Sequence, residues 1–192
     1  SDMDSVAVRQ SLAQGTIEKY LQKLKVQQDD VFYIPAGTVH GIGAGNLIVE
    51  VQESSNLTYR LYDYDRVDKA GQKRELHLEK ALAVADLKGK AAPRQPLRVL
   101  RYTPGSATEF LCRCKYFQVE RLLLNTEGKS KLAELYTGSS SFQALLCLDG
   151  EGYILTEDKE KLAYSKGNCI FIPANTGKLQ LCGRSQFLKI SC

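Results

Sequence analysis

The stretch that decides the fold is VFYIPAGTVHGIGAGNLIVEVQESSNLTYRLYDYDR, residues Val31–Arg66. It holds one of the 2 histidines of the chain and concentrates glycines, carboxylates, aromatic residues and arginines. Runs of β-branched and aromatic residues predict strands at 31–34, 47–53 and 58–62, and the Pro-Ala-Gly-Thr sequence predicts a turn that leads to His40. Surface loops rarely need such a combination of residues, so we expect this stretch to form part of a functional site.

The same turn sequence occurs again near the C-terminal end. Residues 167–178, GNCIFIPANTGK, align without gaps on residues 29–40, DDVFYIPAGTVH, and Ile-Pro-Ala-x-Thr is identical in both. Such a match predicts two copies of one structural unit. The copies differ at their last position, where His40 corresponds to Lys178. If the histidine binds a metal, only the first copy can do so.

The remaining segments have simpler patterns. Residues 1–28 are predicted to form a helical hairpin, because an amphipathic run from 4 to 26 is interrupted by Gly15. Residues 67–98 are predicted to be a linker with a connecting helix at 75–87. Residues 99–192 contain short apolar runs separated by turn sequences such as that at 149–152, which predicts a β-sandwich or barrel. Strands are predicted at 117–124, 143–148, 152–156, 169–172, 178–181 and 187–190.

Composition argues against nucleic-acid and membrane binding. The chain is 43% hydrophobic and 25% charged, with a net charge of +4 and no basic run. No apolar run approaches the roughly 18 residues of a membrane span, and the N-terminus has no signal-peptide pattern. We therefore expect a cytoplasmic protein with reduced cysteines, of which Cys147 and Cys169 lie in apolar runs and are predicted core residues.

Two motifs resemble known families. The first repeat, with Asp29-Asp30 in place of the usual Gly-Asp and His40 five residues after the proline, resembles the second characteristic motif of the cupin barrels. The stretch Pro35–Arg66, followed by RELHLEKAL at 74–82, resembles the short bacterial type I phosphomannose isomerases. This resemblance is specific in Pro35–Arg66, moderate in 74–82 and weak beyond Pro104. It implies a mostly β fold of two cupin-like units (double-stranded β-helix, or jelly roll). The first is incomplete and spans 29–66, and the second, at 99–192, is without metal.

The resemblance also implies a site. Members of the family interconvert mannose 6-phosphate and fructose 6-phosphate with a bound metal, expected to be zinc, held by Gln, His and Glu side chains and by the histidine of the turn. Only the last is present, as His40, because the Gln-x-His and Glu motifs would lie upstream of Asp4. Arg60 matches the family's active-site arginine, whose guanidinium binds phosphate or stabilises enediolate charge. Glu50 matches a carboxylate proposed as base or proton relay, and burial in the predicted apolar strand 47–53 would raise its pKa toward useful values.

Other polar residues of the stretch are expected near the site or on the surface. The neighbours expected around the site are Glu53, Tyr62 and Asp63. The second histidine, His77, is expected on the surface of the 75–87 helix.

Two functional interpretations stay open at this point. One is a metal-dependent sugar-phosphate isomerase, present as a C-terminal portion that lacks the upstream metal ligands and is inactive alone. The other is a non-catalytic cupin module that binds sugar phosphate or assembles with a partner chain. A small-molecule sugar phosphate is the expected partner in both, and a homodimer or strand-swapped assembly would cover an exposed barrel edge.

Overall fold

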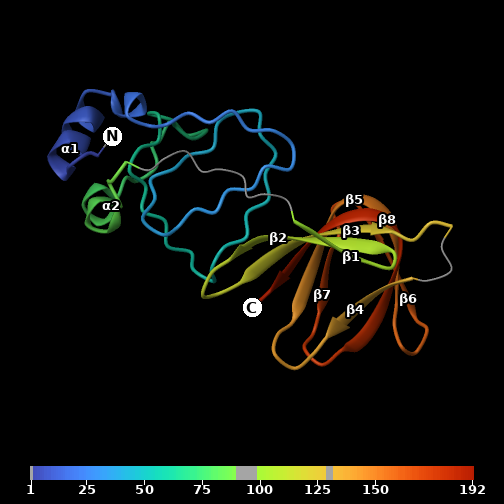
Figure 1. Ribbon diagram of the computed structural model, residues 1–192. Helices are drawn as coiled ribbons and strands as arrows, with labels where there is room; N and C mark the ends of the chain where they lie inside the picture. Colours follow the sequence, from blue (N-terminus) through green and yellow to red (C-terminus); the bar gives the residue numbers. More distant parts are fainter. Residues whose placement is uncertain (1, 90–98, 129–131) are drawn as a thin grey trace. The chain divides into compact units, whose positions relative to one another are not determined.

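The computed structural model describes residues 2–89, 99–128 and 132–192. The chain divides into two compact units, Ser1–Gln95 and Pro96–Cys192 (Figure 1). The end of the predicted linker, residues 90–98, lies outside the described residues. Neither α-helix in the described part of the chain has the length and apolar character that a membrane crossing requires.

The second unit is an antiparallel sheet that curls around its own core (Figure 1). Its strands are β1 (Leu100–Thr103), β2 (Ser106–Arg113), β3 (Gln118–Asn125), β4 (Ala133–Thr137), β5 (Gln143–Leu155), β6 (Lys161–Ser165), β7 (Cys169–Ile172) and β8 (Gly177–Ser191). The order is β1-β2-β3-β8-β5-β6, with β4 also paired to β8 and β7 also paired to β5. The predicted mostly β class is therefore confirmed.

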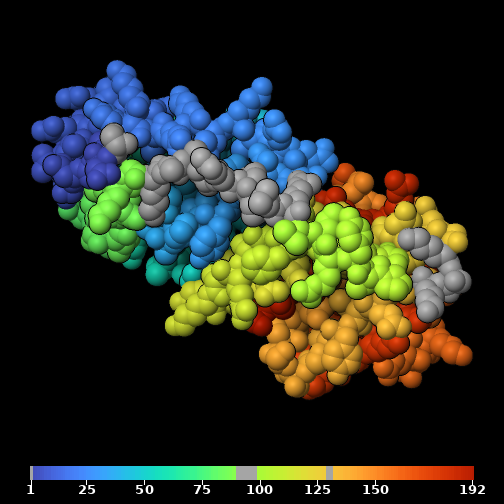
Figure 2. All heavy atoms as spheres, viewed as in Figure 1, coloured from blue at the N-terminus to red at the C-terminus, as the bar shows by residue number. Residues whose placement is uncertain are grey.

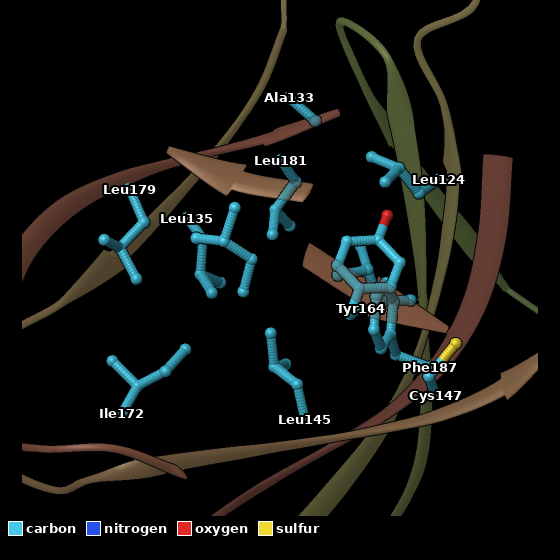
Figure 3. Packing of buried hydrophobic residues seen from close by; sticks show 12 residues of the cluster. Leu124, Ala133, Leu135, Leu145, Cys147, Tyr164, Ile172, Leu179, Leu181 and Phe187 are labelled. Atoms are coloured by element: carbon cyan, nitrogen blue, oxygen red, sulfur yellow. The ribbon is translucent and has the colours of Figure 1, made fainter. Parts of the chain in front are cut away.

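Alternation along the strands builds the core of this unit. Residues of β4 are alternately buried and exposed, as expected when successive side chains point to opposite faces. Figure 3 shows Leu145, Tyr164 and Phe187 converging inside the sheet, and Leu145 and Phe187 are 0% exposed. The rings of Tyr164 and Phe187 meet edge to face with centroids 4.9 Å apart. Burial of each such side chain contributes about 1.5–3 kcal/mol.

Strands β5 and β8 are longer than the sequence predicts. The predicted turn at 149–152 is wrong, because the chain passes through it as a bulge in β5, between Cys147 and Asp149, while pairing with β8. The glycines instead allow the backbones of β5 and β8 to approach closely, since a Cβ on Gly152 would lie 1.9 Å from the main-chain oxygen of Cys182. The two predicted strands at 178–181 and 187–190 are likewise one strand, β8. Gly183, between them, allows the backbone of β5 to approach closely, because a Cβ there would lie 2.3 Å from the main-chain oxygen of Glu151.

The cysteines follow the alternation of their strands. All 6, which lie within the described ranges, have no disulfide partner. Cys147 is buried at 1% exposure, as predicted. The prediction for Cys169 is wrong, because β7 turns Ile170 and Ile172 toward the core and leaves Cys169 exposed.

The helices of the first unit are short. Helix α1 (Ser5–Ala13) begins where the Asp4 carboxylate accepts a hydrogen bond from the Ala7 amide at 2.7 Å. It is followed by Gly15 at φ +65 and by a 3-10 helix, η1 (Ile17–Lys19), where a full second helix was predicted. The helical hairpin is thus not confirmed, because apolar positions beyond η1 such as Leu24 stay exposed and give a helix no face to bury. Helix α2 (Leu78–Val84) lies within the predicted 75–87 helix.

The three strands predicted for Val31–Arg66 are absent from the structure over that described stretch. Its apolar side chains are open to solvent: Ile34 is 45% exposed, Val49 48% and Leu47 99%. The early, blue part of the chain forms much of the visible surface of the first unit (Figure 2). A strand is stable only when neighbouring strands take its hydrogen bonds and cover its apolar face, so the prediction fails because the stretch lacks neighbouring strands, although its residues favour them.

Candidate functional site

His40 follows a turn that is tightly anchored within the first unit. The Thr38 amide donates to the Pro35 carbonyl at 3.1 Å, and Gly37 adopts φ +83, which favours glycine. The Gly37 carbonyl accepts from the Asp86 amide at 2.8 Å, and a Cβ on Gly37 would lie 2.7 Å from the main-chain oxygen of Val84. The turn is therefore seated against the end of α2, and only glycine fits there.

The side chain of His40 is exposed, with its Nδ1 2.8 Å from the Thr38 carbonyl oxygen. This contact within the turn orients the imidazole ring. The opposite ring nitrogen, Nε2, makes no hydrogen bond among the described residues and is available to a ligand.

The second copy of the turn has left-handed residues at two of the same aligned positions. Asp29 and Gly167, which align, have φ of 69 and 90. Gly37 and Asn175, which also align, have φ of 83 and 62. Left-handed residues are uncommon, so their recurrence at two aligned positions supports the predicted repeat at the level of conformation.

The copies differ immediately after the turn. Lys178, at the position of His40, places its Nζ 2.6 Å from a carboxylate oxygen of Glu134 on β4. Its amide donates to Glu157 at 3.2 Å. The second copy therefore uses this position to hold strands together.

Arg60 is fixed by the second histidine, a contact that the sequence does not predict. The Arg60 amide donates to Nδ1 of His77 at 3.2 Å, and the His77 amide donates to the Arg60 carbonyl at 2.8 Å. The guanidinium Nη1 donates to the Glu75 carbonyl at 3.0 Å. His77 thus lies at the N-terminal end of α2 rather than on its surface, and no signal in the local sequence links two residues so far apart.

Glu50 lies exposed, not in a buried strand as expected. Its carboxylate accepts a hydrogen bond of 3.4 Å from the Gln52 amide group. No hydrogen bond or ion pair joins Glu50, Arg60 and His40 to one another, although all three are described. The structure therefore does not assemble the three predicted site residues by direct contact.

Asp63 is the most strongly perturbed carboxylate of the stretch. It is 6% exposed and is held by ion pairs from Arg74 and Arg66, the latter at 2.5 Å. Hydrogen bonds from Arg74 and then from Arg66 lower the pKa of Asp63 from 3.8 to about 2. This carboxylate ties the segment 63–74 together, which is a structural role. Glu53 and Tyr62 make no polar contact that would place them at a site, among the residues that are described.

The residues present do not fit a zinc site. A catalytic zinc ion takes three protein ligands from His, Cys, Asp or Glu. The described residues contain no group of three such side chains that could hold a metal ion. His40 is an exposed single donor, and Nδ1 of His77 is occupied by the Arg60 amide.

The comparisons with known proteins agree on one family. Residues 106–191 match the family described as the mannose-6-phosphate isomerase cupin domain. The mannose-6-phosphate isomerase ManA of Bacillus subtilis is 33% identical over 175 residues, which are 91% of this chain and 53% of that protein. The mannose-6-phosphate isomerase of Streptococcus mutans is 35% identical over 166 residues, covering 86% of this chain and 49% of that protein.

A solved structure shows the same fold. The crystal structure of the mannose 6-phosphate isomerase from Bacillus subtilis matches 100% of this chain and 58% of that one, with a TM-score of 0.79 and 23% identity. The chain spans about half the length of the curated relatives it matches. On these grounds the chain belongs to the mannose-6-phosphate isomerase family of cupin proteins.

Proposed function

We propose that this chain forms part of the active site of an isomerase that interconverts mannose 6-phosphate and fructose 6-phosphate. The observation that carries the proposal is the 33% identity to a mannose-6-phosphate isomerase over 91% of the chain. His40 is the proposed metal ligand, and Glu50 and Arg60 are the proposed catalytic residues.

Arg60 has the features that an anionic substrate needs. Two hydrogen bonds with His77 hold its backbone, and one with Glu75 orients its guanidinium. The other guanidinium nitrogens have no hydrogen-bond partner among the described residues, so they can donate to phosphate or enediolate oxygens.

Glu50 is the proposed base that moves the proton between the two carbons of the isomerisation. A base works best when it is held near the substrate in a site that excludes water. Glu50 is exposed, so the proposal requires that further strands cover residues 47–53 before the carboxylate acts. The chain alone is therefore proposed to be inactive, and its zinc ligands other than His40 are assigned to the part of the family that it does not match.

A fusion protein tests the assignment. The part of Bacillus subtilis ManA outside the matched region is joined upstream of this chain, and turnover of mannose 6-phosphate is measured. We expect activity from the fusion and little or none from the 192-residue chain alone. Robust zinc-dependent turnover by the chain alone would refute the missing-ligand argument, and an inactive but folded fusion would refute the isomerase assignment.

Two substitutions in the fusion separate the roles. Arg60→Ala is expected to lower the rate by on the order of 10²-fold or more with metal retained. His40→Ala is expected to lose metal and activity together. Unchanged zinc content in the His40 variant would show that the ligand assignment is wrong.

A non-catalytic sugar-phosphate-binding or assembly module is the second candidate. It is favoured by the lack of a three-residue metal cluster in the described ranges. In that case the fusion folds, binds fructose 6-phosphate in calorimetry through Arg60, and shows no turnover.

A further inference from the structure

The turn at 63–66 has a backbone conformation that its own side chains disfavour. Tyr64 and Asp65, at its centre, have φ of 56 and 53, and the Arg66 amide donates to the Asp63 carbonyl at 3.0 Å. Two central residues with positive φ are typical of turns built from glycine or asparagine, because a larger side chain there strains the backbone. Tyr64 is the only aromatic residue with a positive φ in the described part of the chain.

A buried carboxylate holds this strained turn in place. Asp63 is 6% exposed, and both Arg66 and Arg74 form ion pairs with it. The Arg66 side chain donates twice, from Nε to the Asp63 carbonyl at 3.3 Å and from Nη2 to the Asp63 carboxylate at 2.5 Å. A glycine in place of Tyr64 would form the same backbone hydrogen bonds without strain. Strain that the surroundings maintain in this way is a feature of functional sites.

The ring of Tyr64 is held on two sides, while its hydroxyl is unused. The ring contacts that of Tyr62 with centroids 4.8 Å apart, and the Arg66 guanidinium carbon lies 5.6 Å from the Tyr64 ring centroid. The residue is 50% exposed, and its hydroxyl makes no hydrogen bond among the described residues. A phenol that is held in place with an unused O–H donor is suited to a polar ligand.

The Tyr64 hydroxyl lies against the residue that follows the proposed metal ligand. A Cβ built on Gly41 would lie 3.6 Å from the Tyr64 hydroxyl oxygen. No other described atom, apart from the chain neighbours of Gly41, comes within 4 Å of that position. His40 directly precedes Gly41, and consecutive Cα atoms are about 3.8 Å apart. The strained turn therefore brings the phenol to the loop that carries His40.

We propose that Tyr64 contacts the substrate in the sugar-phosphate site, where its hydroxyl donates a hydrogen bond to a hydroxyl group of the sugar. A phenol suits an uncharged hydroxyl group, because the anionic oxygens of the substrate are better matched by the guanidinium of Arg60. The strain persists because glycine, which would relieve it, cannot supply the ring. The identity of the ligand rests on the proposed function, whereas the position of the phenol rests on the turn.

Removal of a single oxygen atom tests this contact. The fusion protein described above is titrated in a calorimeter with sorbitol 6-phosphate, which has hydroxyl groups and a phosphate but no carbonyl group to isomerise. Tyr64→Phe keeps the ring, so thermal unfolding should be unchanged while the dissociation constant rises roughly 3- to 10-fold. Tyr20→Phe removes the same oxygen from a ring of the first unit that is 53% exposed, and it should change the constant by less than about twofold.

Two glycine substitutions test whether the strain is kept for the side chain of Tyr64. Tyr64→Gly and Asp65→Gly each relieve one left-handed residue. The Asp65 carboxylate pairs with Lys73 on the surface, where an ion pair contributes little, so Asp65→Gly should raise the midpoint of thermal unfolding by a few degrees. It should bind sorbitol 6-phosphate within about twofold of the unchanged protein. Tyr64→Gly should remain folded and bind on the order of tenfold more weakly. Equal weakening in both variants would assign the effect to the turn and overturn the proposal.

The results for Tyr64 and for the proposed function can be told apart. If the fusion isomerises mannose 6-phosphate but Tyr64→Phe leaves both the binding constant and the turnover unchanged, the contact is overturned and the proposed function stands. If the fusion binds sorbitol 6-phosphate without any turnover and Tyr64→Phe weakens that binding, the contact stands and the isomerase assignment fails. A folded fusion that does not bind sorbitol 6-phosphate overturns the contact.

Discussion

Phe187 tests the account of the barrel core most directly. Its side chain is 0% exposed and meets the ring of Tyr164 edge to face at 4.9 Å. Truncation to alanine removes the ring and leaves a cavity, which costs about 3–5 kcal/mol in well-packed cores. With a urea m-value of about 1–1.5 kcal/mol/M for a unit of this size, the unfolding midpoint should fall by roughly 2–5 M.

Phe171 provides a matched control in the same unit. It is 62% exposed and rests on Phe142 with centroids 5.0 Å apart, so the same Phe→Ala change removes little buried surface. The expected loss is about 1 kcal/mol or less. The assay is urea unfolding followed by far-UV circular dichroism, which reports the sheet. If Phe187→Ala is unfolded from the start, Phe187→Leu gives a graded loss of about 1 kcal/mol. Equal midpoints for the Phe171 and Phe187 alanine variants would refute the proposed core.

Three further predictions concern other parts of the chain. The pKa of Asp63 is lowered from 3.8 to about 2, so its ion pairs stabilise the first unit above pH 4 and are lost as the pH falls toward 2. The Asp63→Asn variant should therefore flatten that part of an acid-unfolding curve, and a wild-type pH profile would contradict the stabilising role of the carboxylate. Gly152→Ala should cost more than about 3 kcal/mol in thermal unfolding, because its Cβ would meet the backbone of β8, whereas Gly128→Ala, with φ +65 and open space, should cost about 1–2 kcal/mol. His77→Ala removes the acceptor of the Arg60 amide and should speed its hydrogen exchange by on the order of tenfold, while an unchanged rate would show that the contact carries no stability.

The sequence predicts the second unit well where alternation is simple. Strands β3 and β7 coincide with predicted runs to within a residue. Strand β2 is missed because Glu109 interrupts its apolar face. That carboxylate is buried against Arg121, directly opposite on β3, at 3.0 Å. A buried ion pair across a ladder looks like two exposed polar residues until the register of the strands is known.

Glycines in strands limit the prediction in the same way. The sequence around Gly150 and Gly152 is typical of a hairpin turn, yet both glycines lie within β5. The backbone of β8 requires them, because a Cβ on either residue would strike it at 2.0 Å or less. A neighbour that is distant in sequence leaves no local signal.

For the candidate site, residue types are predictable from the sequence but their arrangement is not. The resemblance selects His40, Glu50 and Arg60, while the contact that fixes Arg60 comes from His77 and has no local sequence signal. The expected burial of Glu50 depends on strands that would have to cover residues 47–53, and the described chain supplies none. The family pattern therefore carries information about neighbours that the chain itself does not provide.

The repeat explains why one position can carry the proposed metal ligand in one copy and a packing residue in the other. The turn is specified by its proline and by the left-handed residue two positions later, which is Gly37 in one copy and Asn175 in the other. Neither feature constrains the side chain three residues further on. In the second copy, Lys178 forms an ion pair with Glu134 across β4 and β8. In the first, His40 hydrogen-bonds only to the carbonyl of Thr38 within the described residues. Because the turn folds without that side chain, the residue at this position can differ between the copies, and in the second copy it is used for the ion pair between Lys178 and Glu134.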